Sequence, residues 1–446
     1  MNKKNQNIFQ RRLNYEYPVI ERGKGIYLYS KDNKKYIDAV GGAVVANLGH
    51  GIDEIAKAIY KAAKNITYLH GSQFTADYIG EYAKEICKIA PKGLNKVFFV
   101  SGGSEAVESA LKLAMQYHYD SGNKKKYKIV YRKPGYHGST ILTLSLSSKP
   151  TSRKPFEPLV FDFPFIPAPF CYRCQFNEKY PGCKLKCADA LEKAIKRENP
   201  NTISSFIAEP VIGASAGAVV PPNDYFKKIR KICDKHNIIL VIDEVMTGMG
   251  RTGKWFASEH FNLKPDILVV SKGISGGFLP LAAVFCTDKI FNAIKNGSGN
   301  FYHGFTYENN STTIAAGRAV LKYIKENKLI ENSERMGQYL MEKLKNLIDI
   351  DIVGDVRGIG LMTAVEFVSD KKTKKPFSRD KQVAEKILKN AMDMGLNLYF
   401  SVGFIDGKEG DAVMVTPPLN VTKKEIDEIV AIFKKAILKV RQIIKN

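Results

Sequence analysis

The sequence NIILVIDEVMTGMGRTGKWFASEHFNLKPDILVVSKGISGGFLPLAAVFC, residues 237–286, contains two short apolar runs rich in β-branched residues, at 238–242 and 267–270. Runs of this length and composition predict buried strands of a parallel sheet. Asp243 directly follows the first run, and Lys272 closely follows the second. In open α/β sheets, ligands bind outside the carboxyl ends of the strands. We therefore expect both side chains to face one bound molecule.

Two interpretations of this pair stay open from the residues alone. The first is a solvent-exposed lysine and an aspartate that caps a helix, each of which is common at a strand end. The second is a lysine that forms a Schiff base, together with an acid on a pyridinium nitrogen, which is the recurring arrangement for pyridoxal phosphate (PLP). The remaining motifs must decide between them.

The bulk properties predict a soluble, enzyme-sized protein. The 446 residues are 44% hydrophobic and 25% charged, which favours a large α/β domain with a smaller one beside it. No apolar run is long enough for a membrane-spanning helix. The N-terminal MNKKNQNIFQRR lacks the apolar core of a signal peptide. We expect a cytoplasmic protein without a membrane partner.

The formal net charge of +23 raises the question of a nucleic-acid partner. The lysines are spread along the chain, and the densest clusters, 124–126 and 371–375, lie beside turn-forming residues that predict surface loops. No basic helix with interleaved aromatic residues occurs. We therefore expect no nucleic-acid binding; a generally lysine-rich composition or the steering of anionic substrates accounts for the charge.

Strand and helix patterns alternate from residue 96 to residue 286, which predicts a mostly parallel sheet covered by helices. Longer helical segments follow residue 328, and Thr422 and Glu425 form a capping box for the last helix. The N- and C-terminal segments are expected to build a second domain together. The predicted division is 64–328 for the large domain, with 1–63 and 329–446 forming a small α+β domain.

Several short motifs lie at the ends of predicted strands. In SGGS, Gly102 and Gly103 allow close backbone approach, and Ser104 and the following helix N-terminus offer donors, so this is a phosphate site in physical terms. The alternative is a serine cap after a glycine turn. In PGYHGST, Tyr136 or His137 is a candidate for stacking on a planar cofactor.

Two further residues attract attention only weakly by themselves. Glu209 follows another predicted strand, where helix capping is the alternative to an active-site role. Thr306 lies in the turn-rich loop FYHGFTYENNS.

Four cysteines form a separate cluster, with two, eight and three residues between them: Cys171, Cys174, Cys183 and Cys187. The spacing is compatible with a tetrahedral zinc or an iron–sulfur site. Disulfides and free thiols are the alternatives. Any metal here is expected to be structural, since PLP chemistry needs none.

Taken in order, the motifs SGGSEAVE, YHG, AEP, DEVxTGxGRTG, SKG, HGxTY and VGDVRGxGLM resemble the class III aminotransferases, a fold-type I family of PLP-dependent enzymes. The resemblance extends over residues 18–440. It implies a large domain with a mostly parallel, seven-stranded sheet sandwiched by helices, and a small α+β domain from both termini.

The resemblance also implies a role for each matching residue. Lys272 would form the internal aldimine with PLP and carry the proton during catalysis, while Asp243 would pair with the pyridine nitrogen. Gly103 and Ser104 would cradle the phosphate. Glu209 would be the active-site glutamate.

The other residues that match the family pattern would contact the cofactor ring or the neighbouring subunit. Tyr136, with His137 beside it, would contact the cofactor ring. Thr306 would reach the phosphate of the neighbouring subunit. This implies a homodimer with shared active sites, and a tetramer stays open.

The chain departs from the family pattern at several positions. Relatives that act on 4-aminobutyrate or ornithine have arginine where this chain has Ser139, which argues against those two substrates. Met246 replaces a glutamine that contacts the cofactor hydroxyl, and Ser311 replaces a proline. Arg173, within the cysteine-containing insert, is a hypothetical carboxylate ligand.

The expected function is ping-pong transfer of an amino group, through a Lys272 aldimine, from an ω-amino acid or amine to pyruvate or another 2-oxo acid. An α-amino acid donor stays open. The alternative on the same scaffold is an amino-acid racemase or epimerase. A non-catalytic basic or metal-binding interaction protein is the alternative from a different class.

Overall fold

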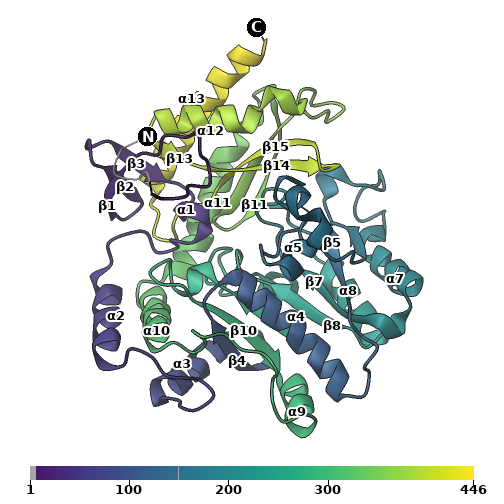
Figure 1. Cartoon of the computed structure of the whole chain (residues 1–446). Coiled ribbons are helices and arrows are strands. Elements are labelled where there is room, and N and C mark those ends of the chain that lie inside the picture. Colours follow the sequence, from purple (N-terminus) through teal and green to yellow (C-terminus); the bar gives the residue numbers. More distant parts are fainter. Residues whose placement is uncertain (1–6, 149, 446) are drawn as a thin grey trace.

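The computed structural model of the chain describes residues 7–148 and 150–445, and its centre is a seven-stranded sheet in the order β4-β10-β9-β8-β7-β5-β6 (Figure 1). Strands β5 to β9 run parallel, whereas β10 is antiparallel to both of its neighbours. The strands are β4 (Leu94–Val100), β5 (Lys128–Lys133), β6 (Phe165–Pro167), β7 (Ile203–Ala208), β8 (Ile239–Asp243), β9 (Ile267–Val270) and β10 (Ala282–Thr287).

Helices cover both faces of this sheet, which explains why its central strands β7, β8 and β9 are buried at every position. Along β8, Ile239 and Val241 pack with α4 (Gly103–Asp120) on one face. Leu240 and Ile242 pack with α7 (Lys186–Glu198) and α8 (Tyr225–Lys235) on the other. Burying each such side chain contributes about 1.5–3 kcal/mol. The strand ends that carry polar residues are therefore held by a rigid layer.

Two smaller sheets lie above the central sheet in Figure 1. One has the order β1-β2-β3-β13 and the other the order β11-β12-β15-β14. Their strands are β1 (Ile20–Lys24), β2 (Tyr27–Ser30), β3 (Lys35–Asp38), β11 (Val353–Ile359), β12 (Met362–Phe367), β13 (Leu396–Asn397), β14 (Tyr399–Ile405) and β15 (Glu409–Val415). Because β3 pairs with β13, segments from the two ends of the chain share one sheet.

The other helices pack around these sheets and along the left-hand side of Figure 1. They are α1 (Gly41–Val44), α2 (Asp53–Asn65), α3 (Asp77–Cys87), α5 (Ile141–Ser145), α6 (Pro150–Arg153), α9 (Asp288–Asn296), α10 (Ser311–Glu326), α11 (Leu329–Lys345), α12 (Val383–Asp393) and α13 (Lys423–Lys445). The short 3-10 helices are η2 (Lys154–Leu159), η3 (Cys171–Arg173), η4 (Pro200–Thr202), η5 (Ala257–Phe261), η6 (Lys272–Ile274) and η7 (Arg379–Lys381).

The predicted capping box is present at the start of α13. The Thr422 N–H and hydroxyl both donate to Glu425 Oε2 at 2.8 Å, and the Glu425 N–H donates back to the Thr422 hydroxyl at 3.3 Å. Of the predicted domain boundaries, residue 63 falls inside α2 and residue 328 falls between α10 and α11. The division into domains stays a prediction.

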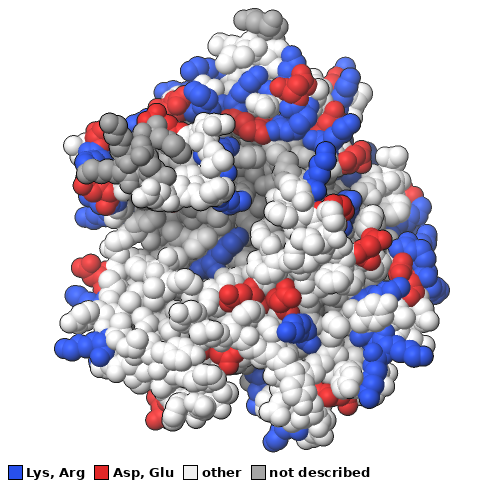
Figure 2. All heavy atoms as spheres, viewed as in Figure 1, with Lys and Arg blue, Asp and Glu red and all other residues white. Residues whose placement is uncertain are grey.

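The charged residues are distributed over the surface. Figure 2 shows basic side chains around the rim of one face, with acidic side chains among them. The prediction that residues 124–126 form a surface lysine cluster is wrong for Lys126. This side chain is buried and donates to four backbone carbonyls, those of Pro200, Ile203, His236 and Asn237. Among the described residues, no helix has both the length and the apolar character needed to cross a membrane.

Candidate active site

A cavity of about 190 Å³ lies where the carboxyl ends of β7, β8 and β9 meet the N-terminus of α4. Its lining unites nearly all of the residues that the sequence singled out. They are Gly103, Ser104, Tyr136, His137, Gly138, Glu209, Ala214, Asp243, Val245, Met246, Ser271 and Lys272. Thus residues from five separate motifs meet in one small cavity.

Lys272 lies two residues beyond the end of β9, at the start of η6. Its backbone has φ of +53°, a left-handed conformation that is uncommon for a residue with a side chain. Burial lowers the pKa of its amine to about 8, although Asp243 and Glu209 act to raise it. Such a lysine is partly neutral near physiological pH, which a nucleophile or a general base requires.

Asp243, the last residue of β8, is held in place by two hydrogen bonds. Its Oδ2 lies 2.7 Å from Nδ1 of His137, and its Oδ1 accepts the N–H of Val245 at 3.0 Å. Both side chains are buried. His137 is therefore the partner of the aspartate, rather than only a candidate for ring stacking.

Glu209 follows β7 and is also buried. Its Oε1 accepts the N–H of Tyr136 at 3.2 Å, and its Oε2 accepts the N–H of Gly213 at 2.8 Å. Burial raises the pKa of this carboxyl. Glu209 thus fixes two loops of the cavity wall in addition to facing the cavity itself.

The N-terminus of α4 forms the opposite end of the cavity. The helix has no side-chain cap, so its first N–H groups and its dipole are available to an anion. Ser104 Oγ accepts the N–H of Ser139 at 3.0 Å. A Cβ on Gly138 would lie 2.6 Å from Ser104 Oγ and 2.5 Å from Thr143 Oγ1, at a φ of +144°. Only glycine allows this close approach.

Of the sequence departures, Met246 lines the cavity and Ser139 contacts one of its lining residues, whereas Ser311 begins α10. The Tyr136 hydroxyl is 3.0 Å from the hydroxyl of Ser139, and Ser139 is exposed. Met246 lines the cavity and brings no hydrogen-bond donor to it. The stacking role of Tyr136 stays a prediction.

Sequence reasoning missed two buried residues in the loop that follows Asp243. Glu244 accepts hydrogen bonds from the Thr247 hydroxyl, the Ala257 N–H and the Ser258 N–H and hydroxyl, which fixes the loop. Arg251 donates to the carbonyls of Leu361, Thr416 and Pro417 and to Asn47 Oδ1.

These contacts join Arg251 to segments from both ends of the chain. Burial lowers its pKa to about 9, and its charge helps to depress the pKa of Lys272. In the sequence, Arg251 was marked only by its place in the GRTG motif, and the motif did not indicate what this residue does.

Thr306 does not line the cavity. It is exposed in the loop between α9 and α10. Within one subunit the structure therefore does not bring Thr306 to the other site residues.

The four cysteines of the insert are free thiols, so the disulfide alternative is absent and the free-thiol alternative is observed. In the part of the chain that is described, no group of three or more His, Cys, Asp or Glu side chains could hold a metal ion. Burial raises the pKa values of Cys171 and Cys187, the latter to about 11, which keeps them as thiols rather than thiolates.

The hypothesis that Arg173 binds a substrate carboxylate is not supported by its contacts. Its Nε donates to the buried Glu366, and its Nη1 donates to the carbonyl of Lys374 at 2.9 Å. Arg173 does not line the cavity.

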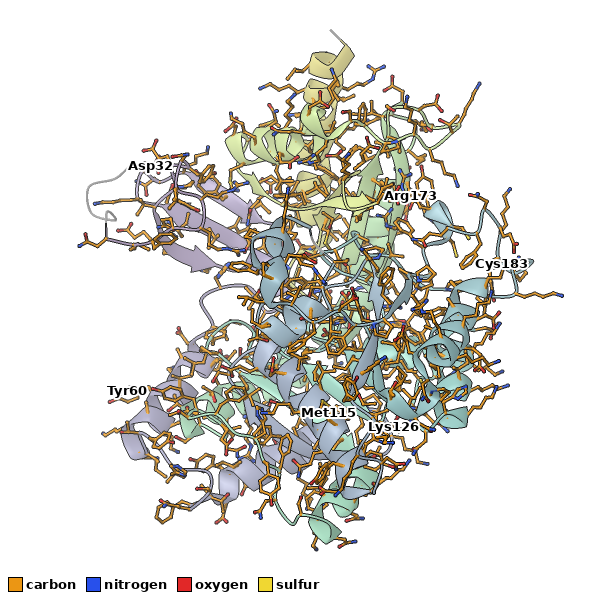
Figure 3. The ribbon with its side chains drawn as sticks, turned by 45° about the vertical axis from the view of Figure 1, so that its right-hand side comes forward. Asp32, Tyr60, Met115, Lys126, Arg173 and Cys183 are labelled. Carbon is orange, nitrogen blue, oxygen red and sulfur yellow. The ribbon has the colours of Figure 1, made fainter. Side chains whose placement is uncertain are left out.

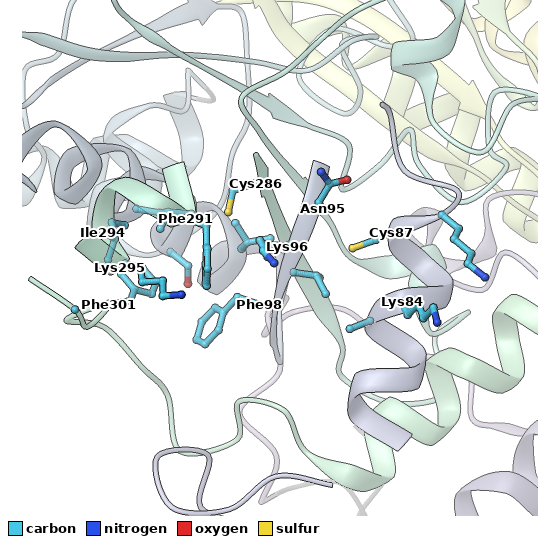
Figure 4. Close-up of a pocket in the computed structure, with 17 residues that line it drawn as sticks. Lys84, Cys87, Asn95, Lys96, Phe98, Cys286, Phe291, Ile294, Lys295 and Phe301 are labelled. Carbon is cyan, nitrogen blue, oxygen red and sulfur yellow. The ribbon is translucent and has the colours of Figure 1, made fainter. Parts of the chain in front are cut away.

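A larger groove, of about 770 Å³, lies between α3, β4, β10 and α9 (Figure 4). It is lined mainly by apolar and lysine side chains, and its lining contains no aspartate, glutamate or histidine. Burial raises the pKa of its thiols, Cys87 to about 11 and Cys286 to about 12. This groove lacks an acid–base pair, so we place the chemistry in the smaller cavity.

The smaller cavity matches the groups that PLP requires. Lys272 offers an amine for a Schiff base, and Asp243 offers a fixed carboxylate for the ring nitrogen. The uncapped α4 N-terminus and Ser104 offer donors for a phosphate. Gly138 lets Ser104 and Thr143 pack directly against the backbone at this end of the cavity.

Comparison with known proteins agrees with this assignment. The Aminotransferase class-III family model matches residues 9–437. The uncharacterized aminotransferase YodT of Bacillus subtilis is 37% identical, covering 97% of this chain and 98% of its own length. The putrescine–pyruvate aminotransferase of Pseudomonas aeruginosa is 32% identical, with 94% and 90% covered.

Among solved structures, the ω-transaminase of Pseudomonas jessenii in complex with PMP superimposes with a TM-score of 0.92. It is 33% identical, and the match covers 99% of this chain and 98% of that one. Fold, cavity and sequence thus agree, and the chain belongs to the class III aminotransferases, whose cofactor is PLP.

Proposed function

We propose that this aminotransferase takes the amino group of an ω-amino acid or a simple amine and transfers it to pyruvate or another 2-oxo acid. The observation that carries the proposal is the juxtaposition of Lys272, Asp243 and the α4 N-terminus around one cavity. Similarity to the putrescine–pyruvate enzyme supports an amine donor and a 2-oxo acid acceptor. Ser139, in place of an arginine, argues against 4-aminobutyrate and ornithine.

Bound PLP supplies an electron sink and a carrier for the amino group. Lys272 would hold the cofactor through its amine, and the same amine, when free, would serve as the general base toward the substrate carbon. Its depressed pKa, to about 8, suits it to this work as a general base.

The other residues hold the cofactor in place. Asp243, fixed by His137, would hold a proton at the pyridine nitrogen of the cofactor by its negative charge. Ser104 and the helix N–H groups would hold the phosphate. Glu209 fixes the loop that carries Tyr136.

A homodimer with shared active sites is the assembly that we propose. Thr306 lies on an exposed loop next to Tyr302 and Tyr307, which are 70% and 63% exposed. The ring of Tyr307 is in edge contact with Tyr68, itself 40% exposed. Exposed aromatic residues gathered on adjoining loops are typical of an interface between subunits.

Hybrid dimers test the shared site. Lys272→Ala subunits and Thr306→Val subunits are mixed and reassembled. If Thr306 serves the partner's cofactor, each hybrid keeps one intact site, and an equal mixture regains about a quarter of the wild-type activity. If Thr306 serves its own subunit, the hybrid has no intact site and the mixture stays at the level of the separate variants.

We also place the protein in the cytoplasm. Its seven cysteines are all free thiols, which is usual in a reducing compartment. Fractionation of the source cells with an antibody against the protein tests this location.

The reaction is tested with the PLP-reconstituted enzyme and a panel of diamines, ω-amino acids and primary amines, each with pyruvate and with 2-oxoglutarate. Amine transfer that depends on the acceptor supports the proposal. Single enantiomers of α-amino acids are incubated with and without an acceptor in parallel. Loss of optical activity without an acceptor, together with no transfer in the panel, would overturn the proposal in favour of a racemase.

A further inference from the structure

A second polar cavity, of about 360 Å³, lies beside the catalytic one at the carboxyl ends of β5 and β6. Five parts of the chain enclose it: the two ends of the 133–148 segment, strand β6, the cysteine-containing insert through Gln175, the loop that carries Ser215, and the β14–β15 hairpin. Its lining residues are Lys133, Pro134, Ser148, Phe165, Pro167, Gln175, Ser215, Val402, Gly403, Phe404, Asp406 and Gly407.

Buried ion pairs brace the walls of this cavity. Glu366, which is fully buried, pairs with Arg173 of the insert and with Arg357 of β11, the latter at 2.5 Å. Arg357 also donates to the carbonyls of Ala216 and Gly217 at 2.6 Å, directly after Ser215. Figure 3 shows Arg173 on the insert, beside the strands of the small domain. The insert and the Ser215 loop are thus tied to one buried carboxylate.

One residue that lines the cavity, Ser215, carries an unsatisfied polar group. Ser215 is only 7% exposed, and its hydroxyl has no hydrogen-bond partner in the part of the chain described. A buried hydroxyl left without a partner is costly, so such a group implies a ligand or water that completes it.

Two residues of opposite charge, Lys133 and Asp406, line the cavity, and among the described residues they form no ion pair with each other. Lys133 Nζ lies 4.9 Å from the centre of the Phe165 ring and forms no ion pair, and Asp406 has no side-chain partner among the described residues. Phe404 and Val402 add apolar surface to the lining. This combination of a cation, an anion, a buried hydroxyl and an apolar wall matches a small molecule that carries both an ammonium and a carboxylate.

We propose that this cavity binds an amino-acid-sized zwitterion. The carboxylate would lie towards Lys133 and the ammonium towards Asp406, and the Ser215 hydroxyl would donate to the ligand. Gln175 adds a donor and an acceptor from the insert. No covalent step occurs here, and the proposal does not depend on the reaction assigned to Lys272.

The new cavity is separate from the catalytic one but shares two segments with it. Pro134 and Ser215 face the new cavity, whereas Tyr136 and Ala214 face the catalytic cavity. Residues 134–136 and 214–215 therefore form a common wall. Glu209 bonds to the N–H of Tyr136 in this same wall.

The test uses N,N-dimethylglycine, a zwitterion whose tertiary amine cannot form a Schiff base. Its binding to the PLP-loaded enzyme is measured by isothermal titration calorimetry, in parallel with acetate and dimethylamine, which each carry one of the two charges. We expect saturable binding of the zwitterion alone, and affinity at least about ten-fold weaker in both Lys133→Met and Asp406→Asn. Asparagine also tolerates the left-handed backbone of position 406, where φ is +51°.

Lys408→Met is the matched control, because Lys408 is exposed on the same hairpin and does not line the cavity. It should bind dimethylglycine as the wild type does. Thermal unfolding of each variant confirms that it is folded. The proposal is overturned if the wild type shows no saturable binding, if the Lys133 and Asp406 variants bind unchanged, or if acetate or dimethylamine binds equally well.

Discussion

His137 Nδ1 and Asp243 Oδ2 lie 2.7 Å apart, although 106 residues separate them in the chain. The parallel pairing of β5, β7 and β8 brings them together, because each residue lies at or just beyond the carboxyl end of its strand. The pair is buried, so the aspartate has a fixed orientation before a cofactor binds. This preorganisation favours tight binding of a protonated ring nitrogen.

Removing the histidine should therefore weaken cofactor binding and catalysis. His137→Phe keeps a ring of similar size but leaves Asp243 without its buried partner. Hydrogen bonds to charged groups contribute about 1.5–3 kcal/mol, so we expect PLP affinity and kcat/KM to fall by about 10- to 100-fold. Fluorescence titration of the apoenzyme with PLP measures the first quantity. His236→Phe, which removes a half-buried partner of Glu192, is the control. Equal PLP affinity in the two variants would contradict this role.

Gly138→Ala should disrupt the phosphate end of the site. The new Cβ would lie 2.5 Å from Thr143 Oγ1 and 2.6 Å from Ser104 Oγ, on a backbone that disfavours side chains. We expect at least about a hundred-fold loss of PLP affinity, equivalent to about 3 kcal/mol. Gly182→Ala, in the insert, meets only one ordinary contact at 3.4 Å and should leave affinity unchanged. An unaltered PLP dissociation constant for Gly138→Ala would argue against this position of the phosphate.

Acid should destabilise the protein through His118. This side chain is fully buried, its Nε2 bonds to the carbonyl of Ser204, and its Nδ1 has no partner, so burial lowers its pKa to about 4. The folded-state pKa lies below the unfolded value of about 6.5. The unfolded state therefore binds more protons, and stability is lost as the pH falls from 6.5 towards 4.

Between pH 7.5 and pH 5, the loss of unfolding free energy attributable to His118 is about 2 kcal/mol. Urea unfolding at pH 7.5 and at pH 5 measures it. His118→Gln cannot titrate, so it should show a smaller decrease between the two pH values. A decrease equal to that of the wild type would assign the acid sensitivity to other groups.

The amine of Lys272 in the apoenzyme should react at a lower pH than surface lysines do. Burial sets its pKa at about 8, against an ordinary value of about 10.4. The rate of acetylation of each lysine is measured by mass spectrometry after short pulses of reagent across a pH series. For Lys272, this rate should reach half of its maximum at a midpoint near pH 8. Asp243→Asn should move this midpoint lower, because the Asp243 charge raises the pKa. A midpoint that matches the exposed lysines would contradict the electrostatic environment described above.

Much of this site could be predicted because its residues lie at strand ends that the apolar runs mark clearly. Asp243 and Lys272 followed from the runs at 238–242 and 267–270, which form β8 and β9. The phosphate-binding end of the cavity was predicted from Gly102 and Gly103, which precede a helix. The physical reason is that a parallel sheet brings the carboxyl ends of its strands to one edge.

Contacts that depend on tertiary packing could not be predicted. The YHG motif indicated an aromatic group, but only the packed structure turns the His137 ring nitrogen towards Asp243. Lys126 had the local sequence of a loop lysine, yet it donates to four backbone carbonyls near the amino ends of β7 and β8. The cysteine spacing matched a metal site, but the packed insert keeps these residues as free thiols. In each case the sequence indicates which functional group is present, but not which atoms that group contacts in the folded protein.

The central claim is that PLP bonds to Lys272 and to no other lysine. The purified enzyme is saturated with PLP, reduced with sodium borohydride, digested and analysed by mass spectrometry. We predict one stoichiometric phosphopyridoxyl group on the peptide that contains Lys272, and none in Lys272→Ala. A stoichiometric adduct on a different lysine, or no adduct on the saturated wild type, would contradict the account.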